Sequence, residues 1–272
     1  MNKIITETQD LTFLKWSHAR TSSGTAGTFL KSQSVVSGKK VYYKLSNFDN
    51  IKGIIGHECV NEIIVDRLLT ILGVAHLEYQ LIHADIEIEG KVYNTWLCAS
   101  QDFKQRGESK AALDNYFQVN KKDNESRYEF CVKNGWKHYI DQMIVIDYLI
   151  MNRDRHGANI EVLRNARNKT LRIAPLFDHG LSFLCSCYTE DEFKRFDILE
   201  DKPCQNFIGS RSTFDNLNFV EEKKAVFSRK LKLEDKEVLF SDLETVLSET
   251  HLKKIWDMLW FRWCEYEKLC NL

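Results

Sequence analysis

The 272-residue sequence lacks most features that mark a special class of protein. It has two prolines, Pro175 and Pro203, no internal repeat and no low-complexity tract, which excludes repeat and low-complexity architectures. No apolar run approaches the length of a membrane span, and the first residues, MNKIITETQDLTF, lack the apolar core of a signal peptide. We therefore expect a cytoplasmic protein with no membrane partner.

Charge and cysteine spacing exclude further classes. The chain has 38 basic and 39 acidic residues, a net charge of −1, so its composition gives no reason to expect direct binding to nucleic acid or anionic lipid. Among its 8 cysteines, Cys185 and Cys187 have a single residue between them. A zinc site normally uses paired ligands with two to four residues between them. We expect reduced, buried thiols and no metal cluster.

The sequence does contain the material for a substantial core. Apolar residues make up 43% of the chain, and there are 16 Phe, 10 Tyr and 6 Trp, a composition typical of a folded globule. The length suits one domain or two closely packed lobes.

The first hundred residues predict a small sheet with one helix. The runs LTFLKW (11–16) and KKVYYKL (39–45) favour strands, and the glycine- and serine-rich segment between them favours a flexible loop. Apolar residues at helical spacing over 56–74 predict a helix that stops at Gly73. The alternating segment 78–100 carries the turn EIEGK and predicts a hairpin.

The rest of the chain is mainly helical. The runs AALDNYFQV (111–119) and KHYIDQMIVIDYLIMN (137–152) predict helices, and 159–177 predicts a second hairpin. The tail is helical, with an apolar stripe that we interpret as core, formed by Trp256, Leu259, Trp260 and Trp263. We predict an α+β fold with a β-rich part, residues 1–101, and a larger, mainly helical part, residues 102–272.

Acidic and amide side chains stand where a buried helix meets the second hairpin. Asp154 and Asn159 lie in the segment NRDRHGAN, and Asp178 lies at the far end of the hairpin. Because a hairpin brings its ends together, we expect the two carboxylates and the amide oxygen to converge. Hard oxygen ligands of this kind suit Mg²⁺, which takes the rest of its shell from water and phosphates. The alternative is that the charged residues of NRDRHGAN form a structural salt-bridge cluster at a helix end.

A second group of residues predicts a site for a nucleoside triphosphate. Lys44 lies in a predicted strand, a glutamate follows in the next helix, and the loop Gly24–Gly27 precedes both. In such a site the loop covers the phosphates, the lysine contacts them and the glutamate orients the lysine. Glu58 and Glu62 lie one helical turn apart, so either could pair with Lys44; the run VNEII favours Glu62.

The order and spacing of these motifs resemble a protein kinase. In NRDRHGAN an aspartate is followed five positions later by an asparagine, as in a kinase catalytic loop, and DHG stands where that fold has its metal-binding Asp-Phe-Gly. NRDRHGAN leading into a hairpin, APLFDHGLSF closing it and VNEII opening the helix are similar to HipA-like serine/threonine kinases, the toxin kinases of bacterial toxin–antitoxin systems. The resemblance covers the chain from Thr21 to Asn271. It implies a two-lobed protein-kinase-like fold, with a small N-lobe that ends at residue 101.

The resemblance implies roles for the residues at the reacting centre. Asp154 is expected to be the base that accepts the proton of the substrate hydroxyl. Asp178 is expected to be the main magnesium ligand. His156 and Asn159 are expected at the phosphates, with Asn159 also on the metal.

It also implies how the rest of the nucleotide is held. Lys44 and Glu62 are expected to form an ion pair at the phosphates. The other expected cofactor-binding residues offer backbone groups to the adenine or form the phosphate loop: Ala99, Ser100 and Gln101, and Ser23, Gly24, Thr25, Ala26, Gly27 and Thr28.

The activity implied by the resemblance is transfer of the γ-phosphoryl group of ATP, with Mg²⁺, to a serine or threonine of a protein substrate. The implied partners are an antitoxin or a small polypeptide like an N-terminal subdomain. One hydroxyl of the glycine-bearing loop, on Ser22, Ser23, Thr25 or Thr28, is a candidate for autophosphorylation. Two alternatives are a phosphoinositide-kinase-like lipid or small-molecule kinase, in which an Asp-Arg-His loop also occurs, and a nucleotide-binding pseudokinase that acts as a regulatory partner.

Overall fold

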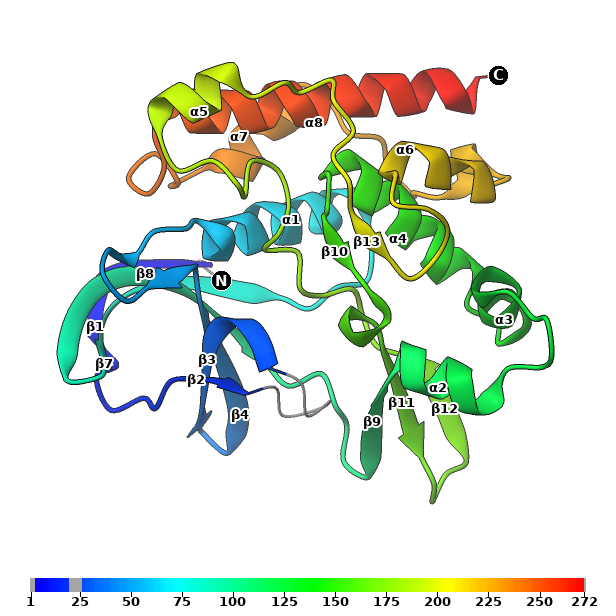
Figure 1. Ribbon diagram of the computed structural model, residues 1–272, viewed down its shortest axis with the longest axis horizontal. Helices are drawn as coiled ribbons and strands as arrows, with labels where there is room; N and C mark the ends of the chain where they lie inside the picture. Colours follow the sequence, from blue (N-terminus) through cyan, green and yellow to red (C-terminus); the bar gives the residue numbers. More distant parts are fainter. Residues whose placement is uncertain (1–2, 20–25, 272) are drawn as a thin grey trace.

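The computed structural model describes residues 3–19 and 26–271. Its largest element is a six-stranded sheet with the strand order β1-β7-β8-β4-β3-β2, in which β1 and β7 are parallel and the other neighbours are antiparallel (Figure 1). Its strands are β1 (Ile4–Asp10), β2 (Ser17–Ala19), β3 (Ala26–Val36), β4 (Lys39–Leu45), β7 (Tyr79–Ile88) and β8 (Lys91–Gln101).

Three smaller sheets complete the β-structure of the described chain. The order β12-β11-β9 makes one of them, and β10-β13 and β5-β6 are two-stranded. Their strands are β5 (Phe48–Asp49), β6 (Gly53–Ile54), β9 (Glu108–Ala112), β10 (Asp154–Arg155), β11 (Glu161–Asn165), β12 (Thr170–Ile173) and β13 (Gln205–Asn206).

Helix α1 packs on the large sheet, and the other helices build most of the C-terminal half (Figure 1). They are α1 (Glu58–Leu72), α2 (Leu113–Asn120), α3 (Arg127–Lys133), α4 (Lys137–Leu149), α5 (Glu190–Arg195), α6 (Thr213–Asn216), α7 (Asp235–Phe240) and α8 (Glu249–Cys270). In Figure 1, α1 lies between the large sheet and the layer formed by α5, α7 and α8. The mixture of sheets and helices confirms the predicted α+β class.

Helix α1 is almost completely enclosed because it packs on both of these layers. Twelve of its 15 residues are buried, and it contacts β7 and β8 on one side and α7 on the other. It ends as the sequence predicts, at Gly73, whose left-handed backbone (φ 73°) lets its N–H bond to the last carbonyls. The two predicted hairpins are also present, as β7–β8 and β11–β12.

The prediction for the first forty residues was wrong in two places. The run 11–16 is not a strand but a turn and an extended segment, in which Leu14 N–H bonds to the carbonyl of Leu11 at 3.1 Å. The segment from Ala26 to Val36, predicted as flexible loop, is strand β3. Its pairing with β4 buries Leu30 and Ser32 in the sheet. The serines of this segment favoured a loop in the prediction, although the segment ends in the β-branched residues Val35 and Val36.

The main core runs through the molecule without a break at residue 101. One hydrophobic cluster joins apolar residues of α1, β7, α4 and α8, and a second, smaller cluster lies among residues of the large sheet such as Leu45 and Leu97. The division into lobes 1–101 and 102–272 therefore stays a prediction. No helix within residues 3–19 and 26–271 is long and apolar enough to cross a bilayer.

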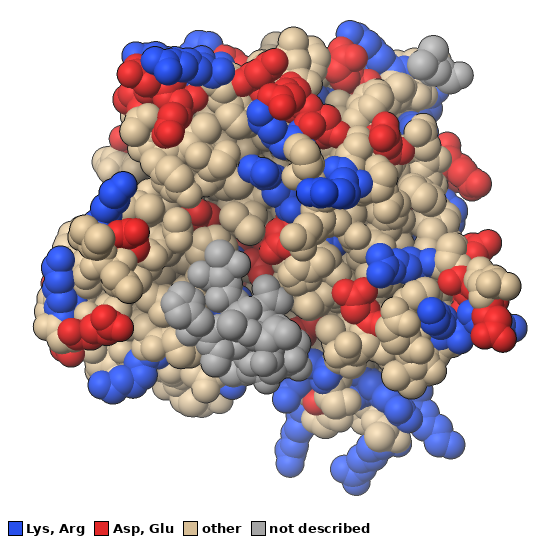
Figure 2. Space-filling model, viewed as in Figure 1, with Lys and Arg blue, Asp and Glu red and all other residues tan. Residues whose placement is uncertain are grey.

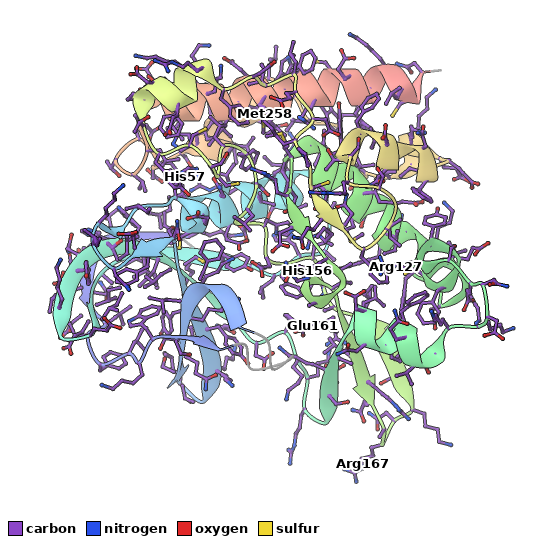
Figure 3. The ribbon with its side chains drawn as sticks, viewed as in Figure 1. His57, Arg127, His156, Glu161, Arg167 and Met258 are labelled. Carbon is purple, nitrogen blue, oxygen red and sulfur yellow. The ribbon has the colours of Figure 1, made fainter. Side chains whose placement is uncertain are left out.

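Positive charge gathers at one edge of the molecule. Figure 2 shows Lys and Arg side chains projecting below the turn between β11 and β12, where Arg164, Arg167 and Lys169 are exposed. The opposite, buried end of that hairpin carries Glu161, and Figure 3 shows Glu161 near the turn with His156, away from Arg167 at the tip.

Two buried histidines join the start of α1 to α8. The rings of His57 and His251 lie 4.3 Å apart, and His251 stacks on Phe193 of α5 at 3.9 Å. Burial lowers the pKa of His57 to about 4 and that of His251 to about 3. Both imidazoles are therefore neutral in the folded protein at neutral pH.

These histidines predict a loss of stability in acid. An unfolded chain protonates both imidazoles below about pH 6.5 while the folded chain does not, so their stabilising effect is complete above that pH and declines as the pH falls toward 4 and 3. For each histidine, this difference in protonation should lower the free energy of unfolding by about 2 kcal/mol between pH 7 and pH 5. Denaturant unfolding at the two pH values should show a smaller decline in His251→Phe, which keeps the ring stack. An equal decline in variant and wild type would contradict the assignment.

Candidate active site

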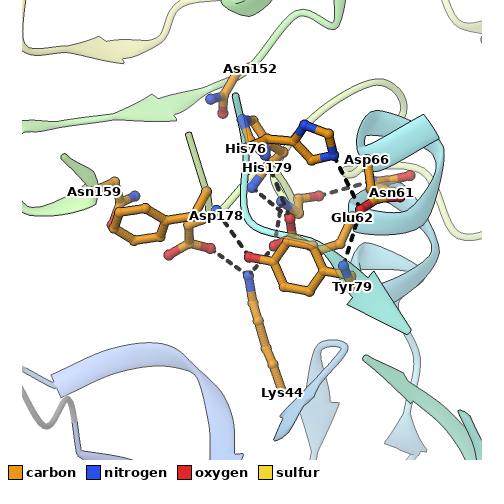
Figure 4. Close-up of polar contacts among 12 residues, drawn as sticks. Lys44, Asn61, Glu62, Asp66, His76, Tyr79, Asn152, Asn159, Asp178 and His179 are labelled. Carbon is orange, nitrogen blue, oxygen red and sulfur yellow. Dashed lines mark hydrogen bonds and ion pairs between the residues drawn. The ribbon is translucent and has the colours of Figure 1, made fainter. Parts of the chain in front are cut away.

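Five of the predicted nucleotide-binding residues line one cavity of about 530 Å³: Lys44, Ser100, Gln101, Asn159 and Asp178. Glu62, Ala99 and His156 are not among its lining residues. Strand β4 supplies Lys44, and the segment after β12 supplies Asp178. Asn159 also lines the cavity, from the short 3₁₀ turn Gly157–Asn159 that precedes β11. Figure 4 shows Asn159 and Asp178 near one another, with Lys44 pointing toward Asp178. A volume of this size suits a small-molecule ligand.

Lys44 forms two short ion pairs at this end of the cavity. Its ammonium lies 2.8 Å from Glu62 Oε1 and 2.5 Å from Asp178 Oδ1, and the residue is buried. Burial by itself lowers the pKa of Lys44, but the carboxylates of Asp178 and Glu62 raise it by more, so the pKa lies well above its ordinary value. The side chain is therefore a permanent cation in the site.

The two glutamates of α1 have different partners. Glu62 pairs with Lys44, as the run VNEII favoured. Glu58 instead accepts a hydrogen bond from the backbone N–H of Asn47 at 3.0 Å, and burial raises its pKa. Pairing with Lys44 therefore distinguishes Glu62 from the carboxylate one turn earlier.

Helix α1 also holds the DHG segment. Glu62 accepts hydrogen bonds from the backbone N–H groups of His179, at 2.9 Å, and Gly180, at 3.1 Å. The amide of Asn61 donates to the carbonyls of Gly180 and Ser182, at 2.9 and 3.0 Å. Asp178 thus projects into the cavity from a segment whose next residues are fixed to the helix.

Asp178 itself has an uncommon backbone. Its φ of 61° lies in the left-handed region, which costs free energy for a residue with a side chain. The hydroxyl of Tyr79 accepts a hydrogen bond from its backbone N–H at 3.3 Å. His179, the next residue, is buried, and burial together with the charge of Arg155 lowers its pKa well below its ordinary value, so it is neutral.

Asp154 and Asn159 are joined within their own loop. The amide nitrogen of Asn159 donates to the backbone carbonyl of Asp154 at 2.8 Å and approaches Asp154 Oδ2 at 3.3 Å. This orients the amide so that Oδ1 of Asn159, which is buried, has no hydrogen-bond partner among the described residues. His156 lies at the same turn, with Nε2 3.4 Å from Asp154 Oδ1.

A magnesium ion fits this donor set. A buried amide oxygen without a donor is costly, and the amide oxygen of Asn159 is such an atom. It lines the same cavity as the carboxylate of Asp178. Carboxylate and amide oxygens are the ligands that Mg²⁺ takes in proteins.

Arg155, which the sequence left without a role, ties the loop to its surroundings. It is 1% exposed, and its guanidinium binds Asp147 of α4 through Nε, at 2.9 Å from Oδ2, and through Nη2, at 3.0 Å from Oδ1. Nη1 donates to the carbonyls of Asn159, at 3.3 Å, and Phe177, at 2.8 Å. Burial alone lowers the pKa of Arg155, but Asp147 raises it by more, and the net shift is upward.

Only part of the predicted adenine-binding strand and phosphate loop is found at the cavity. Ser100 and Gln101 line the cavity, but Ala99 and Ser100 lie inside β8 and pair with both β4 and β7. Their backbone groups are engaged in the ladders, and Asp102 and Phe103, which also line the cavity, follow where the strand ends. Of the phosphate loop predicted at 23–28, Ala26–Thr28 begin β3, and residues 23–25 lie outside the described residues.

The arginine contacts predict a large loss of stability in Arg155→Lys. A compact ammonium cannot make the paired bonds to Asp147 and also reach both carbonyls, so we expect the free energy of unfolding to fall by about 3 kcal/mol. Denaturant unfolding measures it. Arg153→Lys is the matched control, since Arg153 forms no ion pair within the described chain, and its change should stay within about 0.5 kcal/mol. Equal losses in both variants would argue against the role of Arg155.

Comparison with known proteins supports a kinase fold. No family model and no curated protein sequence matches the chain. Among solved structures, the proinflammatory kinase CtkA of Helicobacter pylori aligns over 96% of this chain and 99% of its own, with 17% identity and a TM-score of 0.61. HipA of Shewanella oneidensis MR-1, from a complex with HipB and operator DNA, aligns over 94% of this chain and 68% of its own, with 12% identity and a TM-score of 0.48. The chain therefore shares its fold with the kinase CtkA, as the kinase-like motifs imply.

Proposed function

We propose that the protein is an ATP- and Mg²⁺-dependent serine/threonine protein kinase of the HipA-like type. One observation carries the proposal: Asn159 and Asp178 line the cavity that contains Lys44, and Asp154 is hydrogen-bonded to Asn159 beside it. The kinase fold makes phosphoryl transfer the chemistry to expect from this arrangement, and the similarity in fold alone does not specify a substrate.

In this proposal the cavity holds the nucleotide. Lys44, fixed by Glu62, binds the phosphates, and His156 adds a ring nitrogen at the same place. Of the expected adenine-binding stretch Ala99–Gln101, the backbone groups of Ala99 and Ser100 are engaged in the sheet. The adenine is therefore bound by backbone groups from Gln101 to Phe103, and the segment 23–28 covers the phosphates. Asp178 and Asn159 hold Mg²⁺, which neutralises charge on the phosphates when bound.

Phosphoryl transfer then requires alignment and one base. Asp154 accepts the proton of a serine or threonine hydroxyl as the hydroxyl oxygen forms a bond to the γ-phosphorus. The bond from that phosphorus to the bridging oxygen breaks, and ADP leaves. Asn159, through its bond to the Asp154 carbonyl, keeps the base at a fixed place relative to the phosphate end of the cavity.

The remaining assignments follow from the motif resemblance. We propose a toxin kinase of a toxin–antitoxin system, with a protein substrate, an antitoxin or a small polypeptide like an N-terminal subdomain as partner, and lobes that meet after residue 101. Autophosphorylation at Ser22, Ser23, Thr25 or Thr28 belongs to the same proposal. Ser23, Thr25 and Thr28 belong to the proposed phosphate loop, and Ser22 directly precedes it.

The two aspartates should fail in different ways. After incubation with Mg-ATP, the intact mass of wild type should rise in steps of one phosphoryl group. Asp154→Asn should bind Mg-ATP normally but transfer about 10²–10⁴-fold more slowly, because it lacks the base. Asp178→Asn should lose the part of its ATP affinity that depends on Mg²⁺, measured by calorimetry with and without the metal. A wild type that binds Mg-ATP without any transfer to itself or to protein substrates would indicate a pseudokinase.

The two glutamates of α1 provide a matched pair. Glu62→Gln removes the charge next to Lys44 and weakens the hold on the DHG segment, so we expect ATP affinity to fall about tenfold or more. Glu58→Gln changes the same type of residue one turn away, without a bond to Lys44, and should bind ATP within about twofold of wild type. The binding isotherms of both variants decide the point, and similar losses would show that Glu62 has no special role.

A further inference from the structure

One buried carboxylate of the cavity has no role in the function proposed above. Glu161, the first residue of β11, is 6% exposed and lines the cavity. Its Oε2 is buried and makes no hydrogen bond with any described residue. The ammonium of Lys110 lies 3.7 Å away, beyond hydrogen-bond distance, and is closer to Asp102, at 3.0 Å. Leaving a buried carboxylate oxygen without a donor is unfavourable, which suggests that a ligand provides the donor.

The position of Glu161 along the cavity restricts what that ligand group is. Asn159 and Glu161 flank Ile160, whose backbone is extended (φ −131°, ψ 121°). Side chains two residues apart on an extended chain project to the same side, about 7 Å from one another. Both side chains line the cavity, so Glu161 lies one step further from the magnesium and phosphate end than Asn159.

The other side of Glu161 has the character of a base-binding site. Phe103 and Phe177 line the cavity there with their rings 5.5 Å apart, and Lys110 lies 4.2 Å from the ring of Phe103. Aromatic walls suit a planar base. Glu161 therefore stands between the end that suits a triphosphate and the end that suits a base, which is where a nucleotide has its sugar.

We propose that Glu161 binds the ribose hydroxyl groups of the nucleotide and sets a preference for ribonucleotides. The inference rests on the proposed nucleotide-binding function. The two hydroxyls of ribose are donors, and a carboxylate accepts from both. Lys110, next to Glu161 on the small sheet, offsets the negative charge that the carboxylate brings toward the phosphates.

The test combines removal of the carboxylate with removal of each hydroxyl. Affinities for Mg-ATP, Mg-2′-deoxy-ATP and Mg-3′-deoxy-ATP are measured for wild type, Glu161→Ala and Glu161→Gln. Wild type should prefer ATP over at least one deoxy analogue by about tenfold or more, as a hydrogen bond to a charged group allows. In Glu161→Ala that ratio should fall to nearly one, while affinity for that analogue changes little; Glu161→Gln, which keeps the shape of the side chain, should be intermediate.

Glu108→Gln is the matched control. Glu108 is a buried carboxylate on β9 of the same small sheet, but it is bonded to Arg172 at 2.7 Å through each oxygen. This variant should keep the wild-type preference for ATP. Thermal unfolding of all variants confirms that they fold, and Glu161→Gln still provides the test if Glu161→Ala does not fold.

Three results would overturn the inference. One is an equal preference for ATP over the deoxy analogues in wild type and Glu161→Ala. Another is an equal loss of affinity for all three nucleotides. The third is a preference of wild type for ATP over purine riboside triphosphate, which lacks the 6-amino group, that disappears in Glu161→Ala, since the carboxylate would then read the base. If wild type binds no nucleotide, the proposed function fails together with this inference; if it binds ATP without a preference that depends on Glu161, only the inference fails.

Discussion

The site depends on one buried ion pair, between Arg155 and Asp147. A single guanidinium binds the carboxylate at the end of α4, the carbonyl of Asn159 and the carbonyl of Phe177. The same side chain therefore bonds both Asn159 and Phe177, the residue directly before Asp178. Burying two charges is unfavourable unless their hydrogen bonds are nearly all made. Here Nε, Nη1 and Nη2 of the arginine all have partners.

A second set of bonds places Asp178 relative to Lys44. Glu62 accepts from the lysine ammonium and from two consecutive backbone N–H groups, and Asn61 donates to two carbonyls of the same segment. Helix α1 is packed on both sides, so its buried polar side chains cannot hydrogen-bond to solvent and bond to neighbouring protein groups instead. The strained backbone of Asp178 is stable because the residues around it are fixed.

Much of this arrangement could be predicted from the sequence, because it depends on local periodicity and on one property of hairpins. The hairpin predicted over 159–177 brings its two ends together, and Asn159 and Asp178, at those ends, do line one cavity. Gly73 marks the end of α1. Strand β3 could not be separated from a loop, because its pairing with β4 decides it and pairing is not local. Helix α3 was missed although Ser126 and Glu129 form a capping box at its start, a signal that the sequence does carry.

The residues that hold the site together were less predictable than those that face the cavity. Arg155 and Asp147 are eight positions apart, and nothing in that spacing distinguishes a buried bidentate pair from a charge pair on the surface. Lys110 and Glu161 come from strands whose neighbours in the sheet follow from tertiary folding. The choice between Glu58 and Glu62 likewise required the rotation of α1 about its axis, which a short apolar pattern leaves uncertain by about one residue.

The bond between Lys44 and Asp178 has a consequence for the order of events in the cavity. The lysine ammonium already contacts two carboxylates, one of them the expected metal ligand. In the proposed function, a triphosphate that entered alone would have to compete with Asp178 for that ammonium. A metal ion that entered alone would have to compete with the ammonium for Asp178. When both arrive as one complex, the metal ion takes Asp178 from the lysine and the triphosphate takes the lysine from Asp178. The two separate competitions then become a single exchange of partners.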